Sequence, residues 1–136
     1  LAQLEKASLF VKRRKENFAF LKSRLKDLED LLYLPKATAD SDPSWFGFPM
    51  TLKPNAPLSR VDMTRFLDER KVGTRLLFAG NLTRQPYMKG LKYRVSGQLD
   101  MTDRVMNQTF WVGIQPALSE EMLEYTALTI EAALGR

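Results

Sequence analysis

The predicted fold of this chain is organised around one segment, Gly73-Thr-Arg-Leu-Leu-Phe-Ala-Gly-Asn-Leu-Thr-Arg-Gln-Pro-Tyr-Met-Lys-Gly-Leu-Lys-Tyr93. It begins with a β-prone run, Thr74 to Ala79, which predicts a core strand that breaks at Gly80-Asn81. The residues that follow are polar and can form hydrogen bonds: Asn81, Thr83, Arg84 and Gln85. Because a buried strand that ends in a polar loop is a common way to place a binding site, we expect this loop to be functional.

Two other segments predict strands that could join this one in a sheet. Residues 45–52 are aromatic and β-prone, with alternating apolar positions in their second half, and residues 109–114 read Thr-Phe-Trp-Val-Gly-Ile. Trp45 and Phe46 stand at the entrance of the first of these strands. Large aromatic side chains in that position either close a core or line a pocket.

Helices are predicted between and after the strands. Ser59, with Asp62 three residues later, begins a helix that Gly73 would stop. Further helices are expected over residues 100–108, capped by Asp100 or Thr102, and from Ser119 to Gly135. The expected fold class is therefore α+β (α/β), a small three-stranded sheet with helices packed on one face.

The first 33 residues predict one long helix. Their apolar side chains recur at helical spacing, without an intervening Gly or Pro: Leu4, Ala7, Val11, Phe18, Leu21, Leu25, Leu28 and Leu32. The first half is longer than so small a domain requires, so we expect residues 1–33 to be an inter-domain helix and residues 34–136 a small C-terminal α/β domain. We also expect the chain to be a fragment of a longer protein, since it does not begin with Met.

The composition excludes several classes of chemistry. The chain has 136 residues with no cysteine and no histidine. This removes disulfides, the usual zinc ligands and a Ser-His-Asp arrangement. Carboxylate-only magnesium sites stay open, but helical contexts explain the clustered Asp and Glu, so we expect no metal site. If the protein is an enzyme, most of its chemistry must lie outside this chain. The sequence shows no apolar run that could cross a membrane and no signal peptide, and we expect a cytoplasmic protein.

The net charge of +5 raises the possibility of nucleic-acid binding. Much of the excess lies in Lys12-Arg13-Arg14-Lys15, but acidic residues such as Glu5, Glu16 and Asp27 are interspersed around it. This pattern is typical of the solvated face of a helix. We therefore expect a solvated helix face, with a free-standing nucleic-acid-binding module as the alternative.

Arg84 and Arg104 are the candidate ligand-binding cations, because each stands beside polar neighbours rather than in a run of charges. A guanidinium group can bind a phosphate or a carboxylate through two hydrogen bonds. The alternative is that these arginines pair with a local carboxylate, such as Asp100 or Asp103. No glycine-rich phosphate-binding motif is present.

Several motifs together resemble the C-terminal part of the DegT-type nucleotide-sugar aminotransferases and dehydrases. They are residues 2–6 with Arg13-Arg14 and Asn17, residues 43–49 (Pro-Ser-Trp-Phe-Gly-Phe-Pro), residues 73–87, residues 103–107 (Asp-Arg-Val-Met-Asn) and residues 110–113 (Phe-Trp-Val-Gly). The resemblance extends over essentially the whole chain. It is closest to the CDP-4-keto-6-deoxyglucose 3-dehydrases of lipopolysaccharide biosynthesis. The run around Asn81 is the most specific part, since the aminotransferases tend to carry His-Tyr and Pro-Leu-His there.

The resemblance implies the small C-terminal domain of an enzyme with the fold of pyridoxal-phosphate-dependent transferases. Such dehydrases use pyridoxamine phosphate, and the CDP-sugar enzymes also carry an iron–sulphur cluster (2Fe-2S) that receives electrons from a reductase partner. The resemblance places these groups and the catalytic residue in the large domain of the full-length protein, so we expect the present chain to contain no catalytic residue, to bind no cofactor and to be inactive alone. The full-length enzyme is expected to be a homodimer that binds a nucleotide-sugar.

The same resemblance implies which residues face the substrate. Phe46 matches an active-site aromatic position and Arg104 a substrate-contacting arginine, while Asn81 and Arg84 lie in a loop expected to face the same cleft. An ordinary sugar aminotransferase of the family remains the alternative. It differs from a dehydrase by a Lys in place of a His at a position outside this chain.

Overall fold

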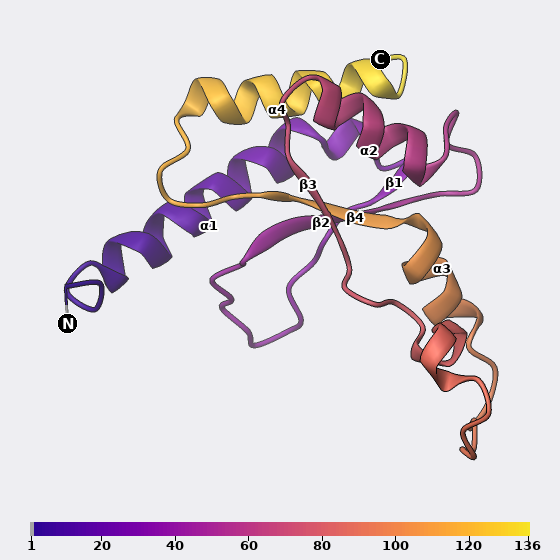
Figure 1. The fold of residues 1–136 in the computed structure, drawn as a ribbon. Helices are drawn as coiled ribbons and strands as arrows, with labels where there is room; N and C mark the ends of the chain where they lie inside the picture. Colours follow the sequence, from indigo (N-terminus) through magenta and orange to yellow (C-terminus); the bar gives the residue numbers. More distant parts are fainter. Residues whose placement is uncertain (1) are drawn as a thin grey trace.

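The computed structural model describes residues 2–136, which form a four-stranded antiparallel sheet with helices packed on one face (Figure 1). The strand order is β1-β2-β4-β3, and every neighbouring pair is antiparallel. The strands are β1 (Leu32–Tyr33), β2 (Gly47–Leu52), β3 (Thr74–Leu76) and β4 (Thr109–Gly113). The predicted class, a small sheet covered on one face, is confirmed.

Alternation along the two central strands separates a covered face from an open one. Phe48, Met50 and Leu52 of β2 and Phe110 and Val112 of β4 are buried in one core. That core also contains residues of α1 (Ala7–Arg24), α2 (Arg60–Glu69) and α4 (Glu120–Ala133), the helices that lie above the sheet in Figure 1. We call the opposite side of the sheet, which carries Gly47, Pro49, Thr51, Thr109 and Trp111, the open face.

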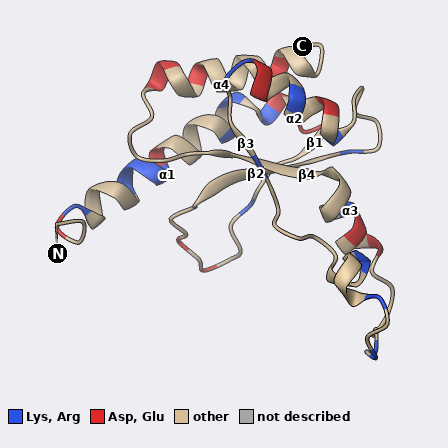
Figure 2. Ribbon diagram, in the orientation of Figure 1, with Lys and Arg blue, Asp and Glu red and all other residues tan. Residues whose placement is uncertain are grey.

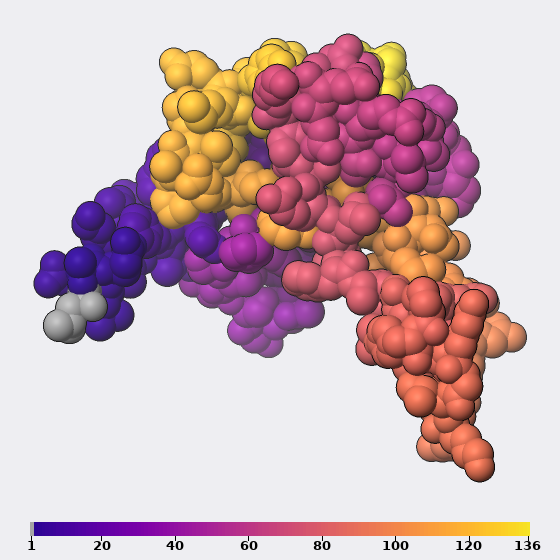
Figure 3. Space-filling model, viewed as in Figure 1, coloured from indigo at the N-terminus to yellow at the C-terminus, as the bar shows by residue number. Residues whose placement is uncertain are grey.

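The remaining α-helix, α3 (Asp100–Gln108), lies apart from the other three. It runs directly into β4 and stands beside the segment that follows β3, which contains the short 3-10 helices η2 (Leu82–Arg84) and η3 (Pro86–Met88). Residues 85–99 extend away from the sheet as a projecting arm (Figures 1 and 3).

The predicted helix over residues 1–33 is too long. The α-helix ends at Arg24 and continues as a 3-10 turn, η1 (Lys26–Leu28), before β1 begins at Leu32. Since a 3-10 helix has three residues per turn, the spacing of Leu25, Leu28 and Leu31 brings all three into the core. The Leu31 carbonyl then accepts a hydrogen bond from the Lys53 amide (2.8 Å), which draws the backbone toward β2.

The number of strands is likewise corrected from three to four. The additional strand, β1, has only two residues, Leu32 and Tyr33, which pair with Leu52 and Thr51. A segment this short carries no periodic signal, and its sequence continues the helical stripe before it. The division at residue 33 into an inter-domain helix and a small domain stays a prediction.

The strand predicted over Thr74 to Ala79 is not a core strand. It spans Thr74–Leu76, pairs only with β4, and is followed by Phe78, whose side chain is 85% exposed. Its position at the edge of the sheet explains the error, because an edge strand has one neighbour and the open face beside it is uncovered in this chain.

Helix ends agree with the sequence in part. Ser59 accepts a hydrogen bond from the Asp62 amide (3.2 Å) and Ser119 from the Met122 amide (3.3 Å), as predicted. Neither Asp100 nor Thr102 caps α3, since Leu99 occupies that position without a side-chain hydrogen bond. These two predicted caps were wrong. The prediction that Gly73 stops α2 was also wrong, because Lys71 adopts the left-handed backbone (φ 64°) that ends this helix.

The basic run on α1 is largely paired within the chain. Lys12 and Arg13 lie within ion-pair distance of Glu16, and Lys15 pairs with Asp42. Basic and acidic positions are interspersed along the described chain (Figure 2), which agrees with a solvated helix face. Within residues 2–136 no helix combines the length and apolar character that a membrane crossing needs.

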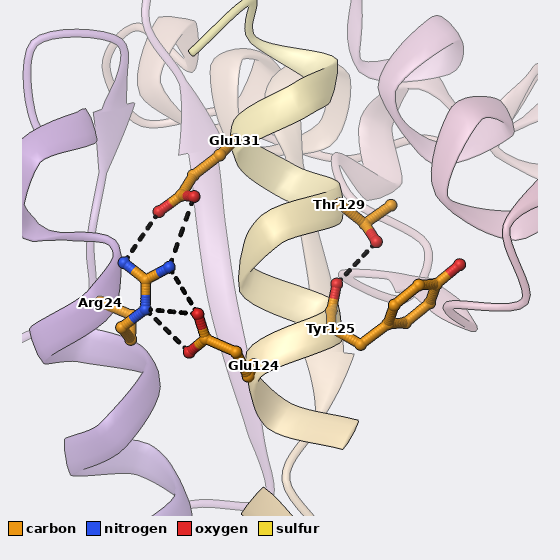
Figure 4. Close-up of polar contacts among 5 residues, drawn as sticks. All are labelled: Arg24, Glu124, Tyr125, Thr129 and Glu131. Carbon is orange, nitrogen blue, oxygen red and sulfur yellow. Dashed lines mark hydrogen bonds and ion pairs between the residues drawn. The ribbon is translucent and has the colours of Figure 1, made fainter. Parts of the chain in front are cut away.

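Arg24 joins α1 to α4 through two carboxylates (Figure 4). Its Nε and Nη2 each donate to Glu124 at 2.8 Å, and its Nη1 donates to Glu131 at 3.1 Å. The hydrogen bond from Arg24 lowers the pKa of Glu124 below its ordinary value of 4.5. A group with a lowered pKa stabilises the folded state above its unfolded pKa, and this contribution is lost as the pH falls through the folded value.

We therefore predict that Arg24→Met lowers the urea midpoint of this chain at pH 7, and that the difference from wild type shrinks toward pH 3, because the stabilisation by the lowered pKa of Glu124 is lost as the pH falls from its unfolded value toward its folded one. Urea unfolding followed by circular dichroism at the two pH values measures this. Lys26→Met, in η1 directly after α1, is the control: Lys26 is exposed and makes no ion pair among residues 2–136, so the midpoint should stay nearly unchanged. An Arg24→Met deficit that is equal at both pH values would contradict the ion-pair explanation.

Candidate functional site

Phe46 lies at the open face, immediately before β2. Its neighbour Trp45 stacks on Phe18 at 4.8 Å and so turns toward the core, whereas Phe46 is 68% exposed. Trp45 therefore packs against the core, whereas Phe46 lies at a pocket, so each of the two roles expected for these aromatic residues occurs. The Phe46 ring rests against Trp111 (5.3 Å between centroids), and the Arg14 guanidinium lies over it at 5.5 Å.

Trp111 covers the middle of the open face. A Cβ at Gly47, the β2 residue before Phe48, would lie only 2.3 Å from Cε3 of the indole, so the absence of a side chain lets the ring lie against β2. On the other side, the indole Nε1 donates to the Leu76 carbonyl of β3 (3.2 Å). The ring therefore spans the sheet from β2 to β3.

An apolar cavity of about 210 Å³ opens beside these rings. Its lining includes Phe46, Pro49, Leu77, Phe78 and Trp111. Leu77 and Phe78 also line a second cavity of about 420 Å³ with Met101 and Val105 of α3. An apolar surface thus continues from Phe46 across the open face to α3.

Asp103 of α3 organises the polar loop after β3. The buried Asn81 donates from Nδ2 to Asp103 Oδ1 (2.6 Å), and its own Oδ1 accepts from the amide and the hydroxyl of Thr83 (3.0 and 2.7 Å). Arg84 donates from Nη2 to Asp103 Oδ2 (2.6 Å). The structure therefore brings Asn81 and Arg84 together on one carboxylate. For Arg84 this is the alternative stated above, pairing with a local carboxylate.

This pairing changes the protonation behaviour of both charged groups. The hydrogen bond from Arg84, followed by that from Asn81, lowers the pKa of Asp103, and the same contact raises the pKa of Arg84. The carboxylate is therefore ionised at neutral pH and keeps the loop against α3. A neighbouring cavity of about 510 Å³ is lined by Asn81, Arg84 and Asp103 with Tyr93 and Gln98 of the projecting arm.

Arg104 does not join this cluster. Asp103 and Met106 lie three residues apart on the side of α3 that faces the loop, and Arg104 points about 100° away from Asp103. Its side chain is half-buried, and across residues 2–136 it makes no hydrogen bond or ion pair that would neutralise it. Phe46, too, stands apart from the loop, because the cavities that they line share no residue.

The open face does not by itself fit pyridoxal phosphate. That cofactor takes a lysine at its aldehyde and a charged partner at its ring nitrogen. In the part of the chain that the structure describes, the cavity beside Phe46 is lined by apolar and aromatic residues, with no lysine or acidic side chain. Within the same residues, the structure gathers no three acidic side chains that could hold a metal ion.

Sequence reasoning missed three residues that shape this site. All three lie within the family motifs, but the sequence does not predict that Trp111 lies on the open face, that Asp103 organises the loop or that Arg14 contacts Phe46. The alternation Phe110-Trp111-Val112 could have placed the indole opposite the core. Contacts of Arg14 and Asp103 span at least 19 residues of sequence and leave no local signal.

The comparisons with known proteins agree in one family. The family profile of the DegT/DnrJ/EryC1/StrS aminotransferases matches residues 1–131. The chain is 56% identical over 135 residues to the lipopolysaccharide biosynthesis protein RfbH of Salmonella typhimurium, with 99% of this chain and 31% of that protein covered. It is 43% identical over 130 residues to the dTDP-4-dehydro-2,6-dideoxy-D-glucose 3-dehydratase of Saccharopolyspora spinosa, with 96% and 28% covered.

Solved structures share the fold. A crystal structure of GDP-4-keto-6-deoxymannose-3-dehydratase with a trapped PLP-glutamate geminal diamine matches with a TM-score of 0.83 and 22% identity, covering 95% of this chain and 33% of that one. This confirms the predicted fold, a domain of the pyridoxal-phosphate-dependent transferases. The chain spans about a third of the length of the curated relatives that it matches.

We predict that Gly47→Ala destabilises the chain by about 1–3 kcal/mol, because the added methyl group must displace the indole of Trp111. Chemical denaturation, followed by tryptophan fluorescence, measures the change. Gly113→Ala is a matched control: Gly113 pairs with Gly47 across the sheet, and a Cβ there meets nothing within 4 Å. Equal effects of the two substitutions would argue against this packing.

We predict that Asp103→Asn loosens the loop, since Arg84 loses its ionic partner. Trypsin should then cleave after Arg84 severalfold faster at pH 7 than in wild type, as followed by mass spectrometry. Asp100→Asn, on the preceding turn of α3, should leave the rate near that of wild type, because Asp100 makes no hydrogen bond to Arg84 or Asn81. Unchanged cleavage in Asp103→Asn would show that the carboxylate does not hold the loop.

Proposed function

Because the chain belongs to the DegT/DnrJ/EryC1/StrS aminotransferase family, we propose that it is the small domain of a nucleotide-sugar 3-dehydratase that depends on pyridoxamine or pyridoxal phosphate. The 43% identity to a protein named as a sugar 3-dehydratase supports dehydration rather than amino transfer. The 56% identity to a lipopolysaccharide biosynthesis protein supports a role in that pathway. For the substrate we propose CDP-4-keto-6-deoxyglucose, which the sequence resemblance implies.

The open face is the observation that carries this proposal. One side of the sheet is covered by α1, α2 and α4, while the other exposes Phe46 and Phe78 beside an apolar cavity. An exposed apolar surface of this kind marks a site that another body or a ligand covers. We propose that the large domain of the parent protein, the longer protein of which this chain is a part, faces it across the substrate cleft.

The four residues that the family resemblance implies suit the recognition of a nucleotide-sugar. Phe46 offers an aromatic surface, and Arg104 is a half-buried cation without a carboxylate partner among residues 2–136, as a ligand for a phosphate would be. Arg84 is largely exposed and keeps further N–H donors beyond the two that face Asp103. Asn81 is bonded on both sides, so we propose that it acts on the substrate by fixing this loop.

The cofactor contacts belong, in this proposal, to the rest of the parent protein. The cavity beside Phe46 does not fit pyridoxal phosphate, because among the residues that the structure describes its lining has neither a lysine nor an acidic side chain. A 2Fe-2S cluster would also lie outside this chain, because such clusters are held by cysteine thiolates and the chain has no cysteine. We also propose that the parent protein is a homodimer and receives electrons from a reductase partner. The isolated chain is proposed to be inactive.

The test is the activity of the purified parent protein. We expect it to dehydrate CDP-4-keto-6-deoxyglucose at carbon three faster than the corresponding dTDP and GDP sugars. Amino transfer from glutamate without dehydration would assign it to the aminotransferases instead. Binding to nucleic acid that weakens steeply with salt, without either activity, would favour the nucleic-acid alternative.

In the active parent, we predict that Phe46→Leu lowers kcat/KM by up to about tenfold, because an aromatic contact with the substrate is worth about 0.5–1.5 kcal/mol. Phe66→Leu is the matched control: Phe66 lies on α2, on the covered side of the sheet, and kcat/KM should stay near wild type. Equal losses in the two variants would point to a general packing effect and against substrate contact by Phe46.

A further inference from the structure

We propose that Arg14 of α1 positions the Phe46 ring for the substrate. The Arg14 Nη1 donates to the carbonyl oxygen of Trp45 (3.4 Å), and the guanidinium carbon lies 5.5 Å from the centroid of the Phe46 ring. One side chain thus holds both the backbone before Phe46 and the ring itself. The inference rests on the proposed function, because it takes Phe46 to be a substrate contact.

The Phe46 ring needs such support because most of its surface faces solvent. Trp45 is fixed by its stacking on Phe18, but the Phe46 side chain is 68% exposed. An exposed aromatic side chain that few groups contact can exchange between rotamers. Two groups that contact it are Trp111, tilted by 59° against it at 5.3 Å, and Arg14.

Arg14 differs from the other cations of its run. Lys12 and Arg13 pair with Glu16, and Lys15 pairs with Asp42, whereas within residues 2–136 Arg14 has no carboxylate at ion-pair distance. Its positive charge is therefore directed to a carbonyl oxygen and to the face of an aromatic ring. Arginine favours such contacts because its planar group stacks on rings and is weakly hydrated.

The turn of α1 that carries Arg14 is also anchored. Asn17, three residues later and on the same side of the helix, is buried and donates to the carbonyls of Ile114 (3.3 Å) and Gln115 (2.9 Å), directly after β4. Arg14 and Trp111 therefore reach Phe46 from two elements that are tied to each other. This arrangement can hold an exposed ring in one orientation.

A double-mutant cycle in the parent protein tests the inference. A cation–π contact at an exposed site raises the population of the contacting conformation about two- to fivefold. We therefore expect Arg14→Met to lower kcat/KM by that factor, mainly through KM. In the Phe46→Leu background the same substitution should have almost no further effect, because the ring that it positions is gone. An equal loss in both backgrounds would overturn the proposal.

Arg13→Met is the matched control. Arg13 is adjacent on α1 and contacts Glu16 and the Leu118 carbonyl, so its loss perturbs the helix but leaves Phe46 untouched. It should show no coupling to Phe46→Leu. Coupling of the same size for Arg13 would mean that the effect comes from the helix as a whole, and would also overturn the proposal.

A spectroscopic measurement separates this inference from the proposed function. In parent protein labelled with 4-fluorophenylalanine, the Phe46 signal is assigned by its loss in Phe46→Leu, and it should shift in Arg14→Met but not in Arg13→Met. A signal that does not move in Arg14→Met overturns the positioning role, whatever the activity. The expected shift in a parent without dehydratase activity supports the contact while removing the proposed function.

Discussion

The strand β4 is the element on which the rest of the structure depends. It lies between β2 and β3, and its alternation sends Phe110 and Val112 into the core and Trp111 to the open face. Because successive side chains of a strand point to opposite faces, one run of three residues fixes both the packing of the helices and the surface of the candidate site. A shift of its register by one residue would exchange the two faces.

The helical layer and the site are connected through α1. Asn17 binds the carbonyls at the end of β4, Arg24 binds two carboxylates of α4, and Arg14 reaches the loop that carries Phe46. The helix thus stabilises the fold with its second half and contacts the candidate site with its first. Interactions that build the scaffold and interactions that orient a functional side chain share one rigid element, which limits their relative motion.

The polar loop after β3 depends on a single carboxylate. Asp103 accepts hydrogen bonds from both Asn81 and Arg84, and Met106, one turn later, contacts the loop at Gly80. Gly80 adopts a left-handed backbone (φ 65°), and a side chain there would collide with Met106. The loop therefore keeps its position through α3 rather than through the sheet, and a neutral Asp103 would release it.

The sequence by itself determined the elements whose signals are local. Alternation in β2 and β4, the caps at Ser59 and Ser119, and the family motifs around Phe46 and Asn81 are properties of neighbouring residues, and from them the class of fold, three of the four strands and the family followed. Only the tertiary structure decided where the first helix ends, that β3 is an exposed edge strand, and which partners Arg14, Arg84 and Trp111 have. These features depend on contacts between residues far apart in the sequence, where the energy of burial and of pairing outweighs local propensity.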